Sequence, residues 1–351
     1  MKLTRRRTIL GTAGVVAGGS LAGCLSSEDD TSGSGEFNGG YAAFFSLWDW
    51  SQQVSGDVAA FENPVDVGEM GHGWEPDGDL IRRVADTSTF VYLDTTEFSW
   101  AQDLAAQLES DYDTVTVIDA MQGLESELLD WDHDHHEDDH HEDDHHDDHH
   151  DDHHDDHHDD HHDDHHDHDH DHGEFDPHVW LDPVLAQTMV DNIAEGLAEI
   201  DPDNAETFEE NAAAYNEELA EIDAAFEELM ADAERDTGVL AGHDSFGYLE
   251  HRYGFDLHTP VGVSPEAEPS QTDIADTIEF VDDHGIDVVL YDQFESPNLA
   301  NTIVENSGAT EVMAVTPAEG TTAEWSENGW GWLDQMREVN LPAFRKALGA
   351  E

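Results

Sequence analysis

Residues 204–233, NAETFEENAAAYNEELAEIDAAFEELMADA, organise the rest of the chain. Apolar side chains recur there every three or four positions, at Phe208, Ala212, Tyr215, Leu219, Ile222, Phe226 and Leu229. This spacing is typical of an amphipathic helix, because 3.6 residues make one turn and the apolar positions then share a face. Such a helix is about 40 Å long at 1.5 Å per residue. The sequence therefore predicts one long helix here, preceded by a break at Asp201-Pro202.

Short apolar runs alternate with amphipathic segments on both sides of this helix. Before it we predict strands at 41–45, 65–67, 90–93 and 115–118, and helices at 47–54, 77–85, 100–108 and 183–199. After it we predict strands at 239–241, 255–258, 288–291 and 311–315, and helices at 243–253, 272–284, 299–306 and 330–348. The alternation favours parallel-type sheets flanked by helices. We predict an α/β fold of two lobes, 41–203 and 236–351, joined by a long rigid helix at 204–235.

The first 40 residues belong to neither predicted lobe. Three consecutive arginines precede a weakly apolar stretch that is too short to span a bilayer, which requires about 20 apolar residues. We assign residues 1–23 to a twin-arginine export signal. Leu21-Ala22-Gly23-Cys24 resembles a lipoprotein cleavage site, which would leave Cys24 lipid-anchored on the outer face of the cell membrane; an ordinary signal peptide is the alternative. Residues 24–40 are predicted to be a flexible tether.

The charge of the chain is extreme. Lys and Arg total 11 against 85 Asp and Glu, which gives a formal net charge of -74 at pH 7. A nucleic-acid-binding protein needs a basic surface, so this composition argues against that class. Such charge repels itself in dilute buffer, but salt at 1 M screens it within about 3 Å. We interpret the composition as the acidic surface of a halophile's protein; an acidic patch for a cationic partner is the alternative.

Residues 132–172 consist almost entirely of His and Asp, and they hold all but six of the 26 histidines. Such a stretch has no apolar surface to bury, so we predict a disordered loop. Imidazoles suit zinc, copper and nickel, and nearby carboxylates add charge, so we expect many weak metal sites rather than one strong one. The auxiliary ligands would include His133, His135, His136, His140, His141, His145, His146, His149 and His150. Three roles stay open for this loop: gathering metal, sensing it, or solubilising the protein.

Three of the six other histidines occupy equivalent places, in loops beside predicted strands: His72, His178 and His243. Ligands of open α/β sheets bind at such loops, so the three predict one common site. Three neutral imidazoles favour Zn²⁺, whereas Mn²⁺ prefers carboxylates. The remaining histidines have no motif around them and are interpreted as surface or packing residues: His251, His258 and His284.

Several segments around these histidines carry a family resemblance. They are HGWEP at 72–76, DPHVWLDP at 176–183, GHDSFGY at 242–248, YGF at 253–255 and VSPEAEPS at 263–270. Together they resemble the zinc- and manganese-binding lipoproteins of ABC uptake transporters (cluster A-I), and the His/Asp-rich insertion is typical of the zinc-specific branch. The resemblance implies two α/β lobes with one metal ion in the cleft, bound by His72 and His178 from the first lobe and His243 from the second.

The rest of the ligand set stays open. Thr316 falls where manganese-binding relatives carry an acid, so the fourth ligand is water or a carboxylate such as Glu319. The acids nearest the histidines in sequence are predicted to orient the imidazole rings, with turn or N-cap roles as the alternative for the first two. These acids are Asp176, Asp182 and Asp244. Trp74 and Trp180 are expected to pack beside the site.

The resemblance implies the extracellular receptor of an ABC importer, which captures Zn²⁺ and delivers it to permease and ATPase subunits. We expect a monomer that is not an enzyme and does not bind nucleic acid. The alternatives are a Mn²⁺-binding member of the same family, a surface zinc store or adhesin, and a zinc hydrolase, since three histidines with an open position also form a catalytic site. Zinc binding should weaken near pH 6, because free histidine has a pKa near 6.5.

Overall fold

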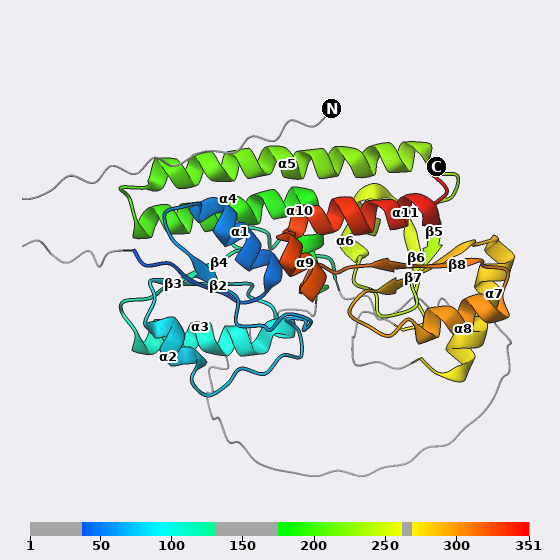
Figure 1. Cartoon of the computed structure of the whole chain (residues 1–351), viewed down its shortest axis with the longest axis horizontal. Helices are drawn as coiled ribbons and strands as arrows, with labels where there is room; N and C mark the ends of the chain where they lie inside the picture. The colour runs from blue at the N-terminus through cyan, green and yellow to red at the C-terminus, as the bar shows by residue number, and fades with distance from the viewer. Residues whose placement is uncertain (1–36, 131–174, 262–268, 351) are drawn as a thin grey trace, which may run out of the picture. The chain divides into compact units, whose positions relative to one another are not determined.

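The computed structural model describes residues 37–130, 175–261 and 269–350 (Figure 1). The predicted signal peptide, Cys24, most of the tether and the His/Asp-rich residues 132–172 lie outside the described residues. No helix in the described part of the chain is long and apolar enough to cross a membrane. Phe37–Glu351 forms one compact unit, and the predicted lobe boundaries within it stay a prediction.

The N-terminal half contains a four-stranded parallel sheet in the order β2-β1-β3-β4. Its strands are β1 Gly40–Ala42, β2 Phe61–Glu62, β3 Thr89–Tyr92 and β4 Thr116–Asp119. Helices α1 Phe45–Ser55 and α4 Pro183–Ile200 lie on one side of the strands, and α2 Leu80–Ala85 and α3 Ser99–Asp111 lie on the other (Figure 1). The prediction of a parallel sheet flanked by helices is confirmed.

The strand predicted at 65–67 is wrong. The strand that pairs with β1 on the side away from β3 is β2, which lies earlier in the chain than the predicted strand and buries Phe61. Asn63 explains the difference, because its Oδ1 accepts the N–H of Val65 at 3.0 Å and forms a local turn. Val65 is buried but Val67 is 53% exposed, so the two apolar residues that suggested a strand do not both pack into the core.

The predicted long helix is confirmed as α5 Ala205–Asp232, whose buried residues include all seven apolar positions of the pattern. It runs beside α4 and continues past α11 Leu341–Ala347 (Figure 1). Near its start, Phe208 packs edge-on against Phe37, with ring centroids 6.1 Å apart. Near its end, Phe226 stacks on Tyr253 at 5.0 Å. The helix therefore contacts both halves of the chain.

The C-terminal half contains two pairs of parallel strands. β5 Thr237–Val239 pairs with β6 Asp256–His258, and β7 Val288–Asp292 pairs with β8 Glu311–Val315. A parallel bridge between Leu240 and Leu290 joins the pairs. The helices between these strands are α6 Gly247–Tyr253, α7 Gln271–His284 and α8 Asn298–Asn306. Most predicted elements of both halves are present, with ends shifted by no more than four residues.

The helix predicted at 330–348 is present as an unbroken helical stretch from 332 to 347, made of α10 Trp332–Gln335, the π-helical segment η3 Met336–Asn340 and α11. The π-helical turn and the short preceding helix α9 Ala323–Asn328 were not predicted. Gly329, with φ of 69°, ends α9 because glycine adopts this conformation without strain. Pro342 lacks a backbone N–H, which fits the widened turn before it. Within that turn, the side chain of Asn340 hydrogen bonds both the N–H and the C=O of Thr316.

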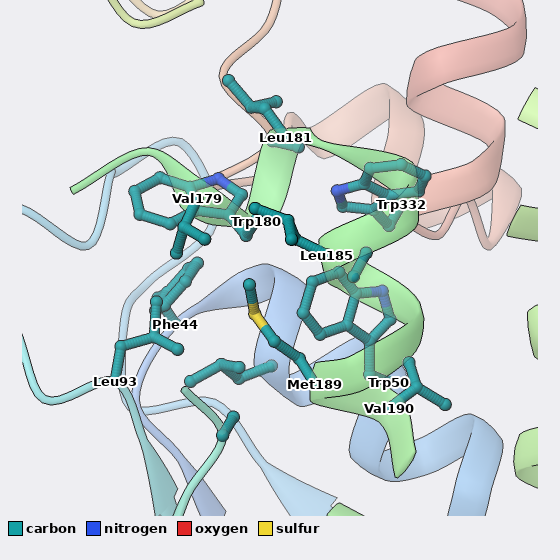
Figure 2. Packing of buried hydrophobic residues seen from close by; sticks show 14 of the residues in the cluster. Phe44, Trp50, Leu93, Val179, Trp180, Leu181, Leu185, Met189, Val190 and Trp332 are labelled. Atoms are coloured by element: carbon teal, nitrogen blue, oxygen red, sulfur yellow. The ribbon is translucent and has the colours of Figure 1, made fainter. Parts of the chain in front are cut away.

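The largest buried side chains lie where the two halves meet. Figure 2 shows Phe44, Trp50, Trp180 and Trp332 gathered around the first turns of α4. Phe44 packs edge-on against Trp180 at 4.9 Å, and Trp50 lies 6.1 Å from Trp332. Asp49 Oδ2 reinforces this contact by accepting the N–H of Trp332 at 2.8 Å. Burial of aromatic groups of this size contributes about 1.5–3 kcal/mol each, so this junction holds the halves together.

Candidate metal centre

His72 lies in the loop between β2 and α2. The preceding Gly71 packs so closely that a Cβ atom would lie 2.7 Å from the side chain of Phe44. The Gly71 carbonyl accepts the indole N–H of Trp100 at 3.3 Å, and Trp74 packs edge-on against Trp100 at 4.8 Å. Trp74 thus supports the His72 loop through Trp100, and the imidazole points into the protein with 7% of its surface exposed.

His178 lies directly before the 3-10 helix η2 Val179–Leu181. Asp176 Oδ1 accepts the N–H of His178 at 2.9 Å and lies 2.8 Å from its Nδ1. The second contact places the ring proton on Nδ1 and leaves the lone pair on Nε2. Trp180 packs beside the imidazole, as predicted, with ring centroids 5.3 Å apart. The motif therefore fixes this histidine locally.

His243 lies in the loop between β5 and α6, and not at the start of a helix as predicted. Its ring is buried and its centroid lies 5.7 Å from those of both His72 and His178. Nδ1 is 3.2 Å from Glu295 Oε1. Nε2 is buried and has no hydrogen-bond partner among the described residues. The structure therefore brings the three predicted histidines together.

Glu319 follows β8 and is fully buried. It comes after Ala318, the one described non-glycine residue with a positive φ, 55°. The carbonyl of Ala318 accepts the hydroxyl of Ser46 at 2.5 Å, and the carbonyl of Pro317 accepts the indole N–H of Trp180 at 2.7 Å. A strained turn held from α1 and η2 thus aims the carboxylate of Glu319.

The carboxylate of Glu319 faces the histidines. Oε2 lies 2.5 Å from Nδ1 of His72. Oε1 lies 3.9 Å from Nε2 of His178, and it has no hydrogen-bond partner in the part of the chain that the structure describes. Buried polar atoms are normally paired. The unpartnered Glu319 Oε1 and His243 Nε2, both able to bind a metal, therefore indicate a place for a cation.

Thr316 has a structural role. Its hydroxyl donates to Gln335 Oε1 at 2.8 Å and accepts the N–H of Ala318 at 3.0 Å. These bonds hold the turn that carries Glu319. Of the two alternatives for the fourth ligand, water and Glu319, the carboxylate of Glu319 lies beside the histidines.

The site holds protons between its imidazoles and carboxylates. Burial alone would lower the pKa of His72, but the Glu319 carboxylate outweighs it and raises this pKa to about 9. Burial likewise opposes the net rise in the pKa of His178, which comes from Asp176 and Glu319. The pKa of Glu319 is lowered, because the surrounding histidines outweigh the effect of burial. A metal ion would take the place of these protons.

Only one of the three acids predicted to orient the rings contacts a candidate ligand among the described residues, namely Asp176. Asp182 caps α4, where it accepts the N–H of Val184, and it pairs with Arg252 at 2.5 Å. Asp244 accepts the N–H of Phe246 at 3.3 Å. The N-cap alternative is therefore correct for Asp182.

The acid that does contact His243 is Glu295, which lies 52 residues further along the chain. Asp292 lies beside it at the end of β7, and burial raises its pKa to about 8. The sequence contains a signal for both residues, since each sits where a predicted strand ends. A search for acids close to the histidines in sequence could not find them, because parallel strands bring loops that are distant in sequence to one edge of the sheet.

The other histidines agree with a packing or surface role. The imidazoles of His258 and His284 both stack on the ring of Phe280, with centroid distances of 4.2 and 3.9 Å. Nε2 of His258 lies 3.0 Å from the hydroxyl of Thr277. His251 is exposed on α6.

Comparison with known proteins places this geometry in a family. The family model described as periplasmic zinc-uptake complex component A (ZnuA) matches residues 41–347. The chain belongs to this zinc-uptake family. It is 32% identical over 315 residues to the zinc-binding lipoprotein AdcA of Streptococcus pneumoniae, covering 88% of this chain and 55% of AdcA. The chain thus spans about half the length of that relative.

One further relative and one solved domain structure match over most of their length. The high-affinity zinc uptake system protein ZnuA of Bacillus subtilis is 29% identical over 306 residues, which cover 87% of this chain and 86% of the relative. The Zn(II)-bound ZnuA-like domain of S. pneumoniae AdcA superposes with a TM-score of 0.67 at 29% identity, covering 90% of this chain and 99% of that domain. The α/β fold is therefore that of zinc-uptake substrate-binding proteins.

Proposed function

We propose that this protein is the metal-binding receptor of an ABC importer, and that it captures Zn²⁺ between His72, His178, His243 and Glu319. One observation carries the proposal. Largely buried side chains from four separate loops lie close together, and Nε2 of His243 and Oε1 of Glu319 have no hydrogen-bond partner among the described residues. Membership of the zinc-uptake family and the Zn(II)-bound relative support the same conclusion.

The chemistry of the four side chains favours zinc. Three imidazole nitrogens and one carboxylate oxygen suit tetrahedral Zn²⁺, with distances of about 2.0–2.2 Å to each ligand. Mn²⁺ prefers a larger share of oxygen ligands, so manganese remains the weaker alternative. Glu319 supplies one negative charge within the pocket, and Asp176 and Glu295 stand behind two of the rings.

We also propose, from membership of the zinc-uptake family, that the protein delivers the ion to a transporter. The ion would pass to the permease and ATPase subunits of the importer, and the protein acts as a monomer without enzymatic activity. The lipid on Cys24 would hold it at the outer face of the membrane, after export by the twin-arginine signal. The acidic composition suits a saline exterior, in keeping with a halophilic source.

The test is equilibrium zinc binding by the full chain, with free zinc buffered by a chelator at about nanomolar levels so that weak sites in residues 132–172 stay empty. We expect one ion per chain, lost in His178→Ala and Glu319→Gln. The exposed His251→Ala is the matched control and should bind like the wild type. Wild-type affinity in His178→Ala would refute the proposal.

Deleting residues 132–172 separates the receptor from a surface zinc store. A receptor keeps its one tight ion and loses only weakly bound zinc. A store loses the tight ion together with the deleted segment. Unchanged weak binding after the deletion would instead leave solubilisation as the role of the segment.

A further inference from the structure

A second group of metal-ligating side chains lies on the Glu295 side of His243. His243, Asp292 and Glu295 each offer one ligand atom, and these atoms all lie within 4.8 Å of one another. The group joins two loops at neighbouring strand ends, because the bridge between Leu240 and Leu290 places β5 next to β7. It contains none of the other three side chains of the proposed zinc pocket.

Asp292 shows that this group is more than a cluster of acids. Its side chain is buried, with only 3% of the residue exposed. Oδ1 accepts the N–H of Phe294 at 2.8 Å. Oδ2 is buried and has no hydrogen-bond partner among the residues that the structure describes. A buried carboxylate oxygen without a donor is unfavourable unless a cation or another donor satisfies it.

Glu295 gives the group a side that faces solvent. Its side chain is 31% exposed, whereas that of Glu319 is fully buried. Gly242 makes room for it, because a Cβ at that position would lie 3.2 Å from Glu295 Oε2. An ion from solvent can therefore reach Glu295 before it reaches Glu319.

We propose that His243, Asp292 and Glu295 form a second divalent-cation subsite, which holds Zn²⁺ on its way into or out of the buried pocket. One imidazole nitrogen and two carboxylate oxygens match zinc chemistry, with water as the fourth ligand. His243 belongs to both ligand sets, and two dications a few ångströms apart repel each other strongly, so the two sites fill in turn. The proposal of a subsite rests on the proposed zinc site, because the subsite would hold the ion before it enters that site or after it leaves.

The direct test uses crystals of the full chain carrying His72→Ala and His178→Ala, soaked in Zn²⁺ and measured at the zinc absorption edge. The buried pocket then keeps only Glu319 and His243. We expect an anomalous peak about 2.0–2.2 Å from ligand atoms of His243, Asp292 and Glu295. The peak should vanish when Asp292→Asn is added. A peak bonded to Glu319 without Asp292, or no peak near His243, overturns the subsite.

A kinetic measurement in otherwise intact protein does not depend on the double variant folding. Glu295→Gln and Asp292→Asn should each slow zinc loading in stopped-flow mixing by about tenfold, the first because a steering charge is lost and the second because a carboxyl ligand is lost. Glu305→Gln removes the same charge from an exposed position on α8 and should load like the wild type. Wild-type loading rates in both Asp292→Asn and Glu295→Gln contradict the subsite.

The two proposals fail in different ways. If wild-type protein shows no ion at His72, His178, His243 and Glu319, the zinc pocket itself is wrong. If that ion is present but the double variant shows none at Asp292 and Glu295, only the subsite is wrong.

Discussion

His178 and Glu319 reach the same pocket by opposite routes. His178 is fixed by its own motif, because Asp176 contacts both its N–H and its ring from two residues away. Glu319 is fixed from a distance, through a strained turn at Ala318 that Ser46 and Trp180 hold from the other half of the chain. A locally held ligand depends on a few adjacent residues, whereas a remotely held ligand depends on the packing of the whole fold.

The largest expected effect comes from deleting either ligand. Zinc sites contribute about 10–16 kcal/mol in total, so one of four ligands is worth roughly 3 kcal/mol, which corresponds to about 100-fold in affinity. His178→Ala and Glu319→Gln should therefore weaken zinc binding about equally, by about 100-fold or more. Competition with a chelator of known affinity measures this. A much smaller loss in Glu319→Gln would show that water, and not Glu319, is the fourth ligand.

Asp176→Asn tests only the local contact that fixes the ring of His178. The amide can no longer act as a charged acceptor for the ring of His178, and loss of such a partner weakens metal binding by about 10–100-fold. The same zinc competition assay checks the result. Asp182→Asn is the control, since Asp182 caps α4 and lies outside the metal pocket; it should change thermal stability more than zinc affinity.

Dependence on pH tests the contact between Glu319 and His72. Glu319 raises the pKa of His72 to about 9, so this ring is protonated at neutral pH and zinc must displace the proton. Zinc affinity should then rise by about tenfold per pH unit up to about pH 9.

The stability of the metal-free fold depends on pH in the opposite direction to zinc affinity. A raised pKa stabilises the metal-free fold fully below the ordinary histidine pKa of 6.5, and this contribution is lost as pH rises through about 9. Titrations in Glu319→Gln should lose both effects. Zinc affinity that levels off at pH 7 in the wild type would contradict the raised pKa.

Trp180→Phe tests the remote route. Phenylalanine keeps much of the aromatic packing but cannot donate to the carbonyl of Pro317, and an unsatisfied buried carbonyl costs about 1–3 kcal/mol. We expect this loss in the free energy of unfolding, measured in urea at fixed salt. Zinc affinity should fall by less than in Asp176→Asn. Trp74→Phe is the control outside the turn, and equal destabilisation in both variants would argue against a special role for Trp180.

The smallest effect is expected at Ala318. Glycine adopts a φ of 55° without strain but loses more entropy on folding, so Ala318→Gly should change stability by less than about 1 kcal/mol. The β-branched Ala318→Val should destabilise the fold by at least about 1–2 kcal/mol, because valine rarely adopts this conformation. Chemical denaturation distinguishes the two. Equal stability of Ala318→Val and wild type would show that the turn is not strained.

The comparison also explains what the sequence could predict. The positions of the three histidines follow from local patterns, because each sits in a loop beside a strand or helix that its neighbours specify. The seven apolar positions of α5 were likewise readable from their spacing. Glu319 could not be singled out in the same way, since its contact with His72 spans 247 residues and depends on how β8 meets α1.

The misassigned acid beside His243 and the unpredicted turn in the C-terminal helix share this cause. Glu295 contacts His243 only because β7 lies beside β5, and Asp244, the nearer acid, turns to Phe246 instead. The C-terminal helix contains an unpredicted π-helical turn at Met336–Asn340, where the side chain of Asn340 hydrogen bonds the backbone of Thr316, 24 residues away. Contacts between segments far apart in the sequence decide these positions, and a local sequence pattern carries no information about such contacts.

The most direct measurement is a crystal structure of the zinc-loaded full chain with data collected on both sides of the zinc absorption edge. We expect one dominant anomalous peak, bonded at about 2.0–2.2 Å to His72, His178, His243 and Glu319. A dominant peak that lacks any one of the three histidines would contradict it, as would a fully loaded protein with no peak in this pocket.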